Sequence, residues 1–424
     1  MNNLVPLLPL IVTFLIFPVI ALLVLRALPA PVRVPVFALV CLGGAFGLTV
    51  LAASHGVRMR NASAFLPIPI FFFALYMVLV GIQYWNVRRA TVHKDSFTTF
   101  AFLFPILVLT YIKYTPDSWN VFHFLTGSKH LPEFFVGISY MAFRLSHMVQ
   151  EVRNEVVPPP RFAEFLSFAF FPPTLSIGPI NPYSNFHNSL HHPDPAVTPL
   201  GRSLLRVIVG ATKYLFLSNL FNQLTYSGLL FDGSPHHPVD LVIAVFAYTL
   251  YVYTNFSGYC DMAIGISGLL GIHVMENFAD PFLSRNLQIF WNRWHISLST
   301  YMRDMMFSPL SKALIRRFGP KSAVHMIAIS IFAVFLVVGV WHGAGLNYVL
   351  FGAWQGVGLV VCHYYTHYLK KRLGKQGYAA YMSNRTIERL GVVVTFTYFS
   401  LGLFLFANTV DQMGRIFQIV HWNF

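Results

Sequence analysis

The chain contains a series of apolar runs that are each long enough to cross a membrane. The hydrocarbon core of a bilayer is about 30 Å thick, and an α-helix crosses it in about 20 residues. Only 10% of the residues are charged, whereas soluble domains carry about 25%. This pattern excludes a soluble enzyme and a disordered or fibrous protein, and it predicts an all-α polytopic membrane protein with about ten to twelve transmembrane helices. The predicted spans are 4–26, 34–54, 64–86, 98–114, 133–151, 202–222, 239–257, 323–341, 347–369 and 389–408.

Two stretches between these runs, 162–180 and 258–292, are only partly apolar and are interrupted by Pro and Gly. A broken backbone at membrane depth needs protein or a water-filled cavity to satisfy its polar groups. We therefore expect both stretches to form re-entrant or horizontal helices that line a cavity. No internal repeat or separate soluble region is apparent, so we expect one membrane-embedded domain over 1–424, whose N-terminal run is a retained span.

The charge distribution predicts the topology of the C-terminal half. The chain has 29 Lys and Arg against 15 Asp and Glu, and short basic loops beside apolar runs face the cytoplasm. Basic residues are concentrated in Glu276–Lys321 and in Lys370–Arg389. Two spans separate these segments, and the turn between the spans contains His342, which should lie far from the cytoplasmic face. We expect a multi-pass protein of the cytoplasmic membrane that contacts lipid and binds no nucleic acid.

The densest polar cluster within apolar sequence is 290–304. On one continuous helix, Trp291, His295, Leu298 and Met302 would share a face. Ionisable groups at membrane depth are costly and usually serve a function. The alternative is an interfacial amphipathic helix, whose Trp and Arg side chains only anchor it at the headgroups.

His342 follows Trp341 at the end of an uncharged run and is followed by Gly343 and Gly345. A neutral imidazole in a partly desolvated site is a suitable general base for a hydroxyl nucleophile. Glycines allow backbone or substrate to approach closely. The alternative is a buried histidine that only bonds to a carbonyl group.

The other histidines are weaker candidates. His363 and His367 have a spacing that could hold a metal or haem, but no carboxylate accompanies them. Five more fall in predicted loops at 181–199 and 236–237, where histidines are usually solvated, and we expect no metal site. These loop histidines are His187, His191, His192, His236 and His237. No nucleotide-binding loop or serine-hydrolase motif is present.

Several motifs occur in a fixed order along the second two thirds of the chain. They are Gly137–Tyr140, Gly178–Ile180, Tyr253–Gly265, Glu276–Phe278, Pro281–Leu283, Phe290–Thr300, Arg303–Asp304 and Trp341–Gly343. In order and spacing these motifs resemble the membrane-bound O-acyltransferase family over about 130–410. Within it the chain is similar to the bacterial branch, which includes alginate O-acetyltransferases and proteins that transfer D-alanine to teichoic acid. Where many relatives have a histidine-glycine pair, this chain has Gln355 and Gly356.

The resemblance implies a helical fold around a central tunnel, with His342 as the main catalytic residue at its narrow point. It implies that His295 is a second functional histidine nearer the cytoplasmic mouth, in agreement with the charge distribution. Residues that could bind substrate or hold the developing oxyanion are Trp341, Asn255, Asp261, Arg293, Ser299 and Asn347.

The resemblance also implies the substrates. The donor would be an acyl thioester on carrier-protein phosphopantetheine or on coenzyme A, and no cofactor would be tightly bound. The acceptor would be a hydroxyl of a cell-envelope or secreted glycan, reached directly or through a separate periplasmic or extracellular transferase. A proton-linked transporter or flippase would use similar broken helices and intramembrane histidines, and a non-catalytic scaffold would not need His342.

Overall fold

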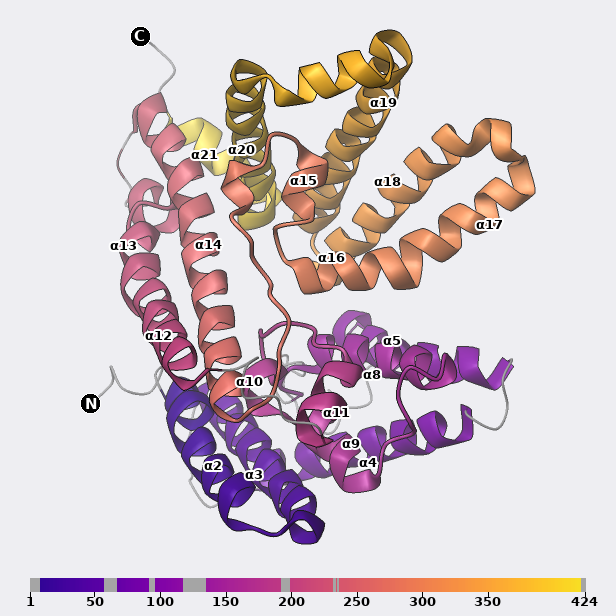
Figure 1. Ribbon diagram of the computed structural model, residues 1–424. Helices are drawn as coiled ribbons and strands as arrows, with labels where there is room; N and C mark the ends of the chain where they lie inside the picture. Colours follow the sequence, from indigo (N-terminus) through magenta and orange to yellow (C-terminus); the bar gives the residue numbers. More distant parts are fainter. Residues whose placement is uncertain are drawn as a thin grey trace. The chain divides into compact units, whose positions relative to one another are not determined.

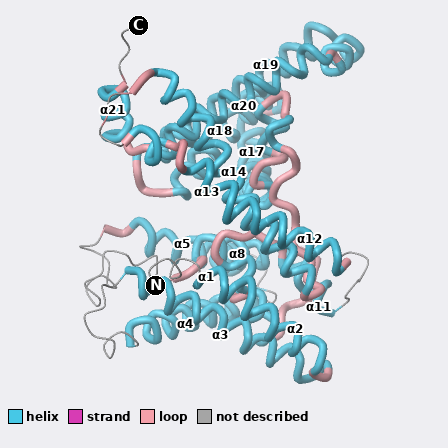
Figure 2. Tube along the Cα trace, turned by 90° about the vertical axis from the view of Figure 1, so that its left-hand side faces the viewer, coloured by secondary structure: helices cyan, strands magenta, loops and turns pink. Residues whose placement is uncertain are grey.

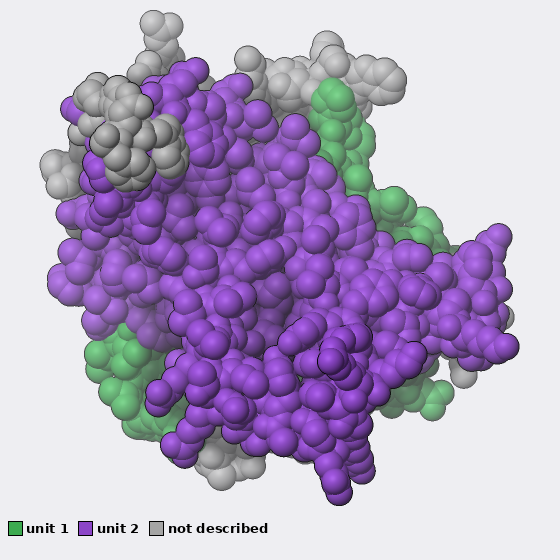
Figure 3. All heavy atoms as spheres, turned by 90° about the horizontal axis from the view of Figure 1, so that it is seen from above, with its two compact units in different colours: residues 1–211, 259–275 green, residues 212–258, 276–424 purple. Residues whose placement is uncertain are grey.

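The computed structural model is helical, with no strands among the residues it describes (Figure 2). The described residues are 8–56, 67–90, 96–116, 135–191, 199–231, 234 and 236–420. The chain divides into two compact units, which Figure 3 shows in different colours. Unit 1 comprises Met1–Ala211 and Tyr259–Met275, and unit 2 comprises Thr212–Gly258 and Glu276–Phe424.

Nine helical segments of the described residues are long and apolar enough to cross a membrane. They are Leu8–Ala27, Pro31–Ala52, Pro69–Ala90, Phe97–Tyr114, Leu200–Leu230, Pro238–Leu269, Pro320–His342, Leu346–Ser383 and Arg385–Ala407. They correspond to nine of the ten predicted runs and confirm an all-α polytopic membrane protein. The tenth run, 133–151, contains α8 (Ile138–Arg153), which is 16 residues long and mostly buried.

The helices of unit 1 bury mainly aromatic side chains. Phe17, Phe37 and Phe171 contact one another with ring centroids 5.9 to 6.4 Å apart. The elements are α1 (Leu8–Ile11), η2 (Val12–Ile16), α2 (Phe17–Ala27), α3 (Ala30–Gly56), α4 (Pro67–Ala90), α5 (Ser96–Tyr114), α8, α9 (Phe162–Ala169), α10 (Pro172–Leu175), α11 (Tyr183–His191) and α12 (Leu200–Ala211), together with the end of α14 (Pro238–Leu269).

A fully buried cation lies inside unit 1. Arg144 of α8 is 1% exposed, and its guanidinium donates to the carbonyl oxygens of Phe168 and Thr174 and lies 4.3 Å from the Phe168 ring centroid. Both carbonyls belong to the last turns of short helices, which have no intrahelical partners for them. The stretch 162–180 is therefore broken, as predicted, into α9 and α10. The carbonyl groups at the ends of these two helices accept hydrogen bonds from the Arg144 guanidinium.

The second stretch, 258–292, differs from the prediction in where it breaks. Helix α14 continues through Gly258 and Gly265 to Leu269, and the helix ends before Gly271, which has a φ of +74°. A Cβ at Gly265 would lie 2.7 Å from the Val207 side chain. This glycine therefore serves close packing against α12 and does not interrupt the helix.

The predicted loop at 181–199 is wrong for its first half, which forms α11. Glu151 of α8 accepts hydrogen bonds from the Tyr183 N–H at 2.8 Å and from the Ser184 hydroxyl at 2.5 Å. This carboxylate caps the start of α11 through a contact that is distant in sequence, so the local pattern could not reveal the helix. His192 lies outside the described residues.

Unit 2 contains the predicted site residues His295 and His342 and is built around an aromatic core. Phe290, Trp291 and Trp294 pack there against Phe399 of α20 and Phe351 of α19. The elements, shown in Figure 1, are η5 (Thr212–Leu217), α13 (Ser218–Asn222), η6 (Tyr226–Leu230), the first part of α14, η7 (Pro281–Leu283), α15 (Leu287–Trp291), α16 (Ile296–Met302), η8 (Arg303–Phe307), α17 (Ser308–Phe318), η9 (Pro320–Ser322), α18 (Ala323–His342), α19 (Leu346–Ser383), α20 (Arg385–Ala407) and α21 (Val410–Ile419).

Candidate active site

The hairpin of α18 and α19 places His342 at the end of α18, as the sequence predicts. Two glycines let the helices approach closely. A Cβ at Gly339 would lie 2.4 Å from the Tyr348 carbonyl oxygen, and one at Gly352 would lie 2.5 Å from the Phe335 carbonyl oxygen. Larger residues would push the helices apart, so these glycines fix the position of His342 against α19.

Aromatic rings surround the half-buried His342. Its ring centroid lies 4.7 Å from Trp341 and 5.0 Å from Phe406 of α20, and Phe406 contacts it edge to face. Gly343 leaves room for the Tyr348 ring, because a Cβ at Gly343 would lie 2.2 Å from that ring. The imidazole is thus held by packing from three helices in a partly desolvated place, which suits a neutral general base.

The segment around His295 is not the single helix that the sequence predicts. Helix α15 ends at Trp291 and α16 begins at Ile296, and His295 between them has a φ of 46° and a ψ of 52°. This left-handed conformation is uncommon for a residue with a Cβ. The break rotates His295 away from the face that a continuous helix would give it, so the predicted common face with Trp291, Leu298 and Met302 is wrong.

Asn277 holds the turn at His295. Its side-chain oxygen accepts hydrogen bonds from the Ser297 N–H at 3.1 Å and the Ser297 hydroxyl at 2.9 Å. It also lies 3.2 Å from Nδ1 of His295. The backbone N–H of Ser297 can only donate, so the Asn277 atom that it contacts is the amide oxygen and not the amide nitrogen. Because that oxygen can only accept, Nδ1 of His295 must carry a proton. Nε2 of the neutral imidazole is then a hydrogen-bond acceptor.

His295 is buried and electrically neutral. Its side chain is 4% exposed, and its ring meets Phe256 of α14 edge to face at 4.7 Å. Burial, with a smaller contribution from His342, lowers the pKa of His295 to about 3. An imidazole with that pKa carries no charge near neutral pH.

One indole lies close to both histidines. The ring centroid of Trp341 is 6.4 Å from that of His295 and 4.7 Å from that of His342. The sequence places these histidines in different motifs, and the fold of unit 2 brings both against the same side chain. The other predicted site residues are described in turn below by the elements that carry them.

A cavity of about 350 Å³ lies beside this region in unit 2. Ser299, Thr300 and Arg303 of its wall come from α16 and η8, and apolar side chains of α18 and α19 face them. Trp291 also lines it, and the indole N–H of Trp291 has no partner among the described residues. Such a size and mixed lining are typical of small-molecule sites. Neither His295 nor His342 is part of the lining.

The remaining predicted residues have varied places. Asn255 is half-buried on α14 next to Phe256. Arg293 is half-buried, and its carbonyl accepts from the Ala279 N–H at 3.0 Å. The Asn347 side chain donates to the Phe406 carbonyl at 3.1 Å and so fastens α19 to α20.

Asp261 belongs to unit 1. Its carboxylate pairs with Arg206 of α12 at 3.0 Å, so the described structure gives it a partner within that unit.

Two residues that contact the histidines, Asn277 and Phe406, were not predicted from the sequence. Asn277 lies in a recognised motif without an obvious role, and Phe406 is one of many aromatic residues, so only the fold singles them out.

Comparisons with known proteins agree on one family. Residues 59–405 match the membrane-bound O-acyltransferase family. The chain is 28% identical to the teichoic acid D-alanyltransferase of Streptococcus thermophilus over 353 residues, which are 81% of this chain and 82% of that protein. It is 29% identical to the protein of the same name from Bacillus subtilis over 65% of this chain and 69% of that protein.

Relatives with other names match at a similar level. The probable alginate O-acetylase of Pseudomonas aeruginosa is 27% identical over 67% of this chain, and the match spans 51% of that longer protein. The peptidoglycan O-acetyltransferase of Helicobacter pylori is 28% identical over 50% of this chain and 39% of that protein.

Proposed function

This chain belongs to the membrane-bound O-acyltransferase family and is a multi-pass membrane O-acyltransferase, and from that premise we propose its reaction. It moves a D-alanyl or acetyl group from a cytoplasmic thioester to hydroxyls of a cell-envelope or secreted glycan outside the cytoplasmic membrane. The names of the relatives support glycan acceptors and both acyl groups. The observation that carries the mechanism is that His295 and His342 both lie beside the Trp341 indole.

His342 is the general base. Its imidazole takes the proton of the acceptor hydroxyl as that oxygen attacks the thioester carbonyl carbon. The new C–O bond forms, the C–S bond breaks, and the proton passes to the departing thiolate. A positioned general base contributes typically about 10²- to 10⁴-fold to the rate. Direct transfer needs no covalent enzyme intermediate.

His295 acts as a hydrogen-bond acceptor. Because Nδ1 donates to Asn277, its Nε2 can orient the acceptor hydroxyl and has no proton to give to an oxyanion. The donors for the oxyanion must then come from other groups, such as Asn255 or Ser299. Of the two roles that the sequence leaves open for His295, this assignment keeps the orientation of a substrate and excludes the donation of a hydrogen bond to the oxyanion.

The cavity in unit 2 suits the thioester arm of the donor. Its polar wall includes Ser299 and Arg303, and its apolar wall suits a flexible chain. The donor is carrier-protein phosphopantetheine or acyl-coenzyme A, and both are anionic. The basic segment Glu276–Lys321 attracts either of them to the cytoplasmic side, and no cofactor is bound permanently.

The test is the alkali-labile ester content of envelope and secreted glycans, measured by mass spectrometry. Cells would carry no chain, the wild-type chain, His342→Ala, or the matched control His367→Ala, which changes an exposed histidine on α19. We expect ester only with the wild-type and control chains, and the released mass identifies the acyl group. Ester at the wild-type level from a normally inserted His342→Ala chain would overturn the assignment. Ester unchanged in the null cells would favour transport.

A further inference from the structure

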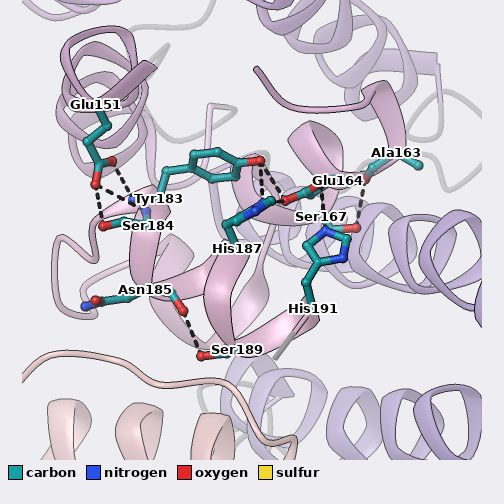
Figure 4. A network of polar contacts seen from close by, with 10 residues as sticks. All are labelled: Glu151, Ala163, Glu164, Ser167, Tyr183, Ser184, Asn185, His187, Ser189 and His191. Carbon is teal, nitrogen blue, oxygen red and sulfur yellow. Dashed lines mark hydrogen bonds and ion pairs between the residues drawn. The ribbon is translucent and has the colours of Figure 1, made fainter. Parts of the chain in front are cut away.

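A cluster of two histidines and one glutamate in unit 1 lies outside the reaction described above. Figure 4 shows Glu164 of α9 with His187 and His191 of α11 turned toward its carboxylate. Nδ1 of His187 is 2.6 Å from one carboxylate oxygen, and Nε2 of His191 is 3.2 Å from the other. Among the described residues, this is the group of three potential metal ligands whose ligand atoms all lie within 4.8 Å of one another.

We propose that Glu164, His187 and His191 bind one Zn²⁺ ion. Zinc sites take imidazole nitrogen and carboxylate oxygen ligands at about 2.0–2.2 Å, so ligand atoms around a tetrahedral zinc lie roughly 3.3 Å apart. The separations of 2.6 and 3.2 Å lie below that value, and all the ligand atoms lie within 4.8 Å of one another, so small rotations of the side chains would admit the ion. Two histidines four residues apart on one helix face, joined by a carboxylate from another helix, form a three-ligand zinc set.

The carboxylate is prepared to act as a ligand. Glu164 is only 3% exposed, and its two carboxylate oxygens lie against Nδ1 of His187 and Nε2 of His191. The Tyr183 hydroxyl donates to it at 2.6 Å, and hydrogen bonds of this kind orient carboxylate ligands in metal sites.

Helix α11, which carries both histidines, is fixed at its two ends. Glu151 accepts hydrogen bonds at its N-terminus. Near its C-terminus, the Ser189 hydroxyl accepts from the His273 N–H at 2.9 Å. The histidines are thus held in place before any ion binds, and this preorganisation favours metal binding.

The fourth position of the zinc is open to solvent on the side of His191. The His191 side chain is 38% exposed, whereas those of His187 and Glu164 are 16% and 4% exposed. A water molecule can therefore complete the tetrahedron. Zinc binding joins α9 to α11 through the ion.

The experiment measures zinc content directly. The full chain would be purified in detergent without a polyhistidine tag, supplied with Zn²⁺, desalted and analysed by inductively coupled plasma mass spectrometry. We expect about one zinc per wild-type chain and almost none in His187→Gln/His191→Gln. His367→Gln is the matched control, because His363 and His367 have the same spacing without a carboxylate, and its zinc content should equal that of the wild type.

Two further measurements keep the proposal testable if the double variant fails to fold. Tyr183→Phe keeps all three ligands and should weaken zinc affinity by about 10- to 100-fold in competition with a chromophoric chelator. The wild-type chain loaded with Co²⁺ should show the strong visible bands of tetrahedral cobalt. A wild-type chain that holds no more zinc than a folded double variant, or shows no such bands, would overturn the site.

Discussion

Asn277 should contribute more to stability and activity than its place in the sequence suggests. We consider Asn277→Ala, which removes an amide oxygen that accepts three hydrogen bonds, from the Ser297 N–H, the Ser297 hydroxyl and Nδ1 of His295. The side chain of Asn277 is fully buried. Water therefore cannot readily replace the lost acceptor.

The magnitude follows from these three contacts. A hydrogen bond contributes about 1 kcal/mol net, and a buried donor left without a partner costs about 1–3 kcal/mol. Asn277→Ala should therefore lower the free energy of unfolding by about 3–5 kcal/mol. The left-handed turn at His295 also loses its anchor, and displacement of a catalytic side chain by about 1 Å can reduce a rate about 100-fold.

The assay compares thermal unfolding and acyl transfer in the same detergent. The matched control is Asn286→Ala, which removes a side chain that accepts one hydrogen bond, from the Ile289 N–H at 2.8 Å, at the start of α15. Loss of such a cap costs about 1 kcal/mol, so the shift in melting temperature should be about one fifth to one third of that for Asn277→Ala. Asn286→Ala should keep its activity.

The variant Asn277→Asp distinguishes the loss of the hydrogen-bond acceptor at position 277 from the effect of a negative charge beside His295. Asn277→Asp keeps an acceptor for the same donors, so it should retain more stability than the alanine variant. Its negative charge favours protonated His295, so the acid limb of the pH–rate profile should move to higher pH. Equal melting temperatures for Asn277→Ala and Asn286→Ala, or full activity in Asn277→Ala, would refute the reasoning.

Two further predictions follow from the geometry. The pKa of His295 is about 3 in the folded chain and about 6.5 in the unfolded chain. As the pH falls, the unfolded chain therefore binds more protons than the folded chain does. The free energy of unfolding should drop by about 2 kcal/mol between about pH 7 and about pH 5. His295→Asn should show a flatter dependence of melting temperature on pH, and an identical slope would contradict the assignment. Gly352→Ala places a Cβ 2.5 Å from the Phe335 carbonyl oxygen and should cost about 1–3 kcal/mol of stability. Gly414→Ala, where a Cβ meets nothing within 4 Å, is its control; it should raise the melting temperature slightly, because alanine favours a helix interior over glycine by about 1 kcal/mol.

The spans and the His342 turn follow from the sequence because they depend on local quantities. A bilayer demands apolar runs of a given length, and the run that ends at His342 becomes α18 with little change of bounds. The glycines that close the hairpin lie within a few residues of the motif. Composition and short-range pattern were sufficient for this part.

The errors occur where a distant contact decides the backbone. A helical pattern over 290–304 cannot reveal the left-handed turn at His295, which Asn277 stabilises from the preceding segment. Likewise the polar segment that becomes α11 depends on Glu151 of α8. In both cases a buried acceptor from elsewhere overrides local propensity.

The buried Arg144 has a consequence for how the chain enters the membrane. An arginine near the middle of a helix costs about 2.5–3.5 kcal/mol on insertion by the translocon, and α8 is only 16 residues long. The carbonyls that receive its guanidinium belong to residues 24 and 30 positions further along the chain, which the ribosome makes later. Helix α8 therefore completes its packing only after α9 and α10 have been synthesised.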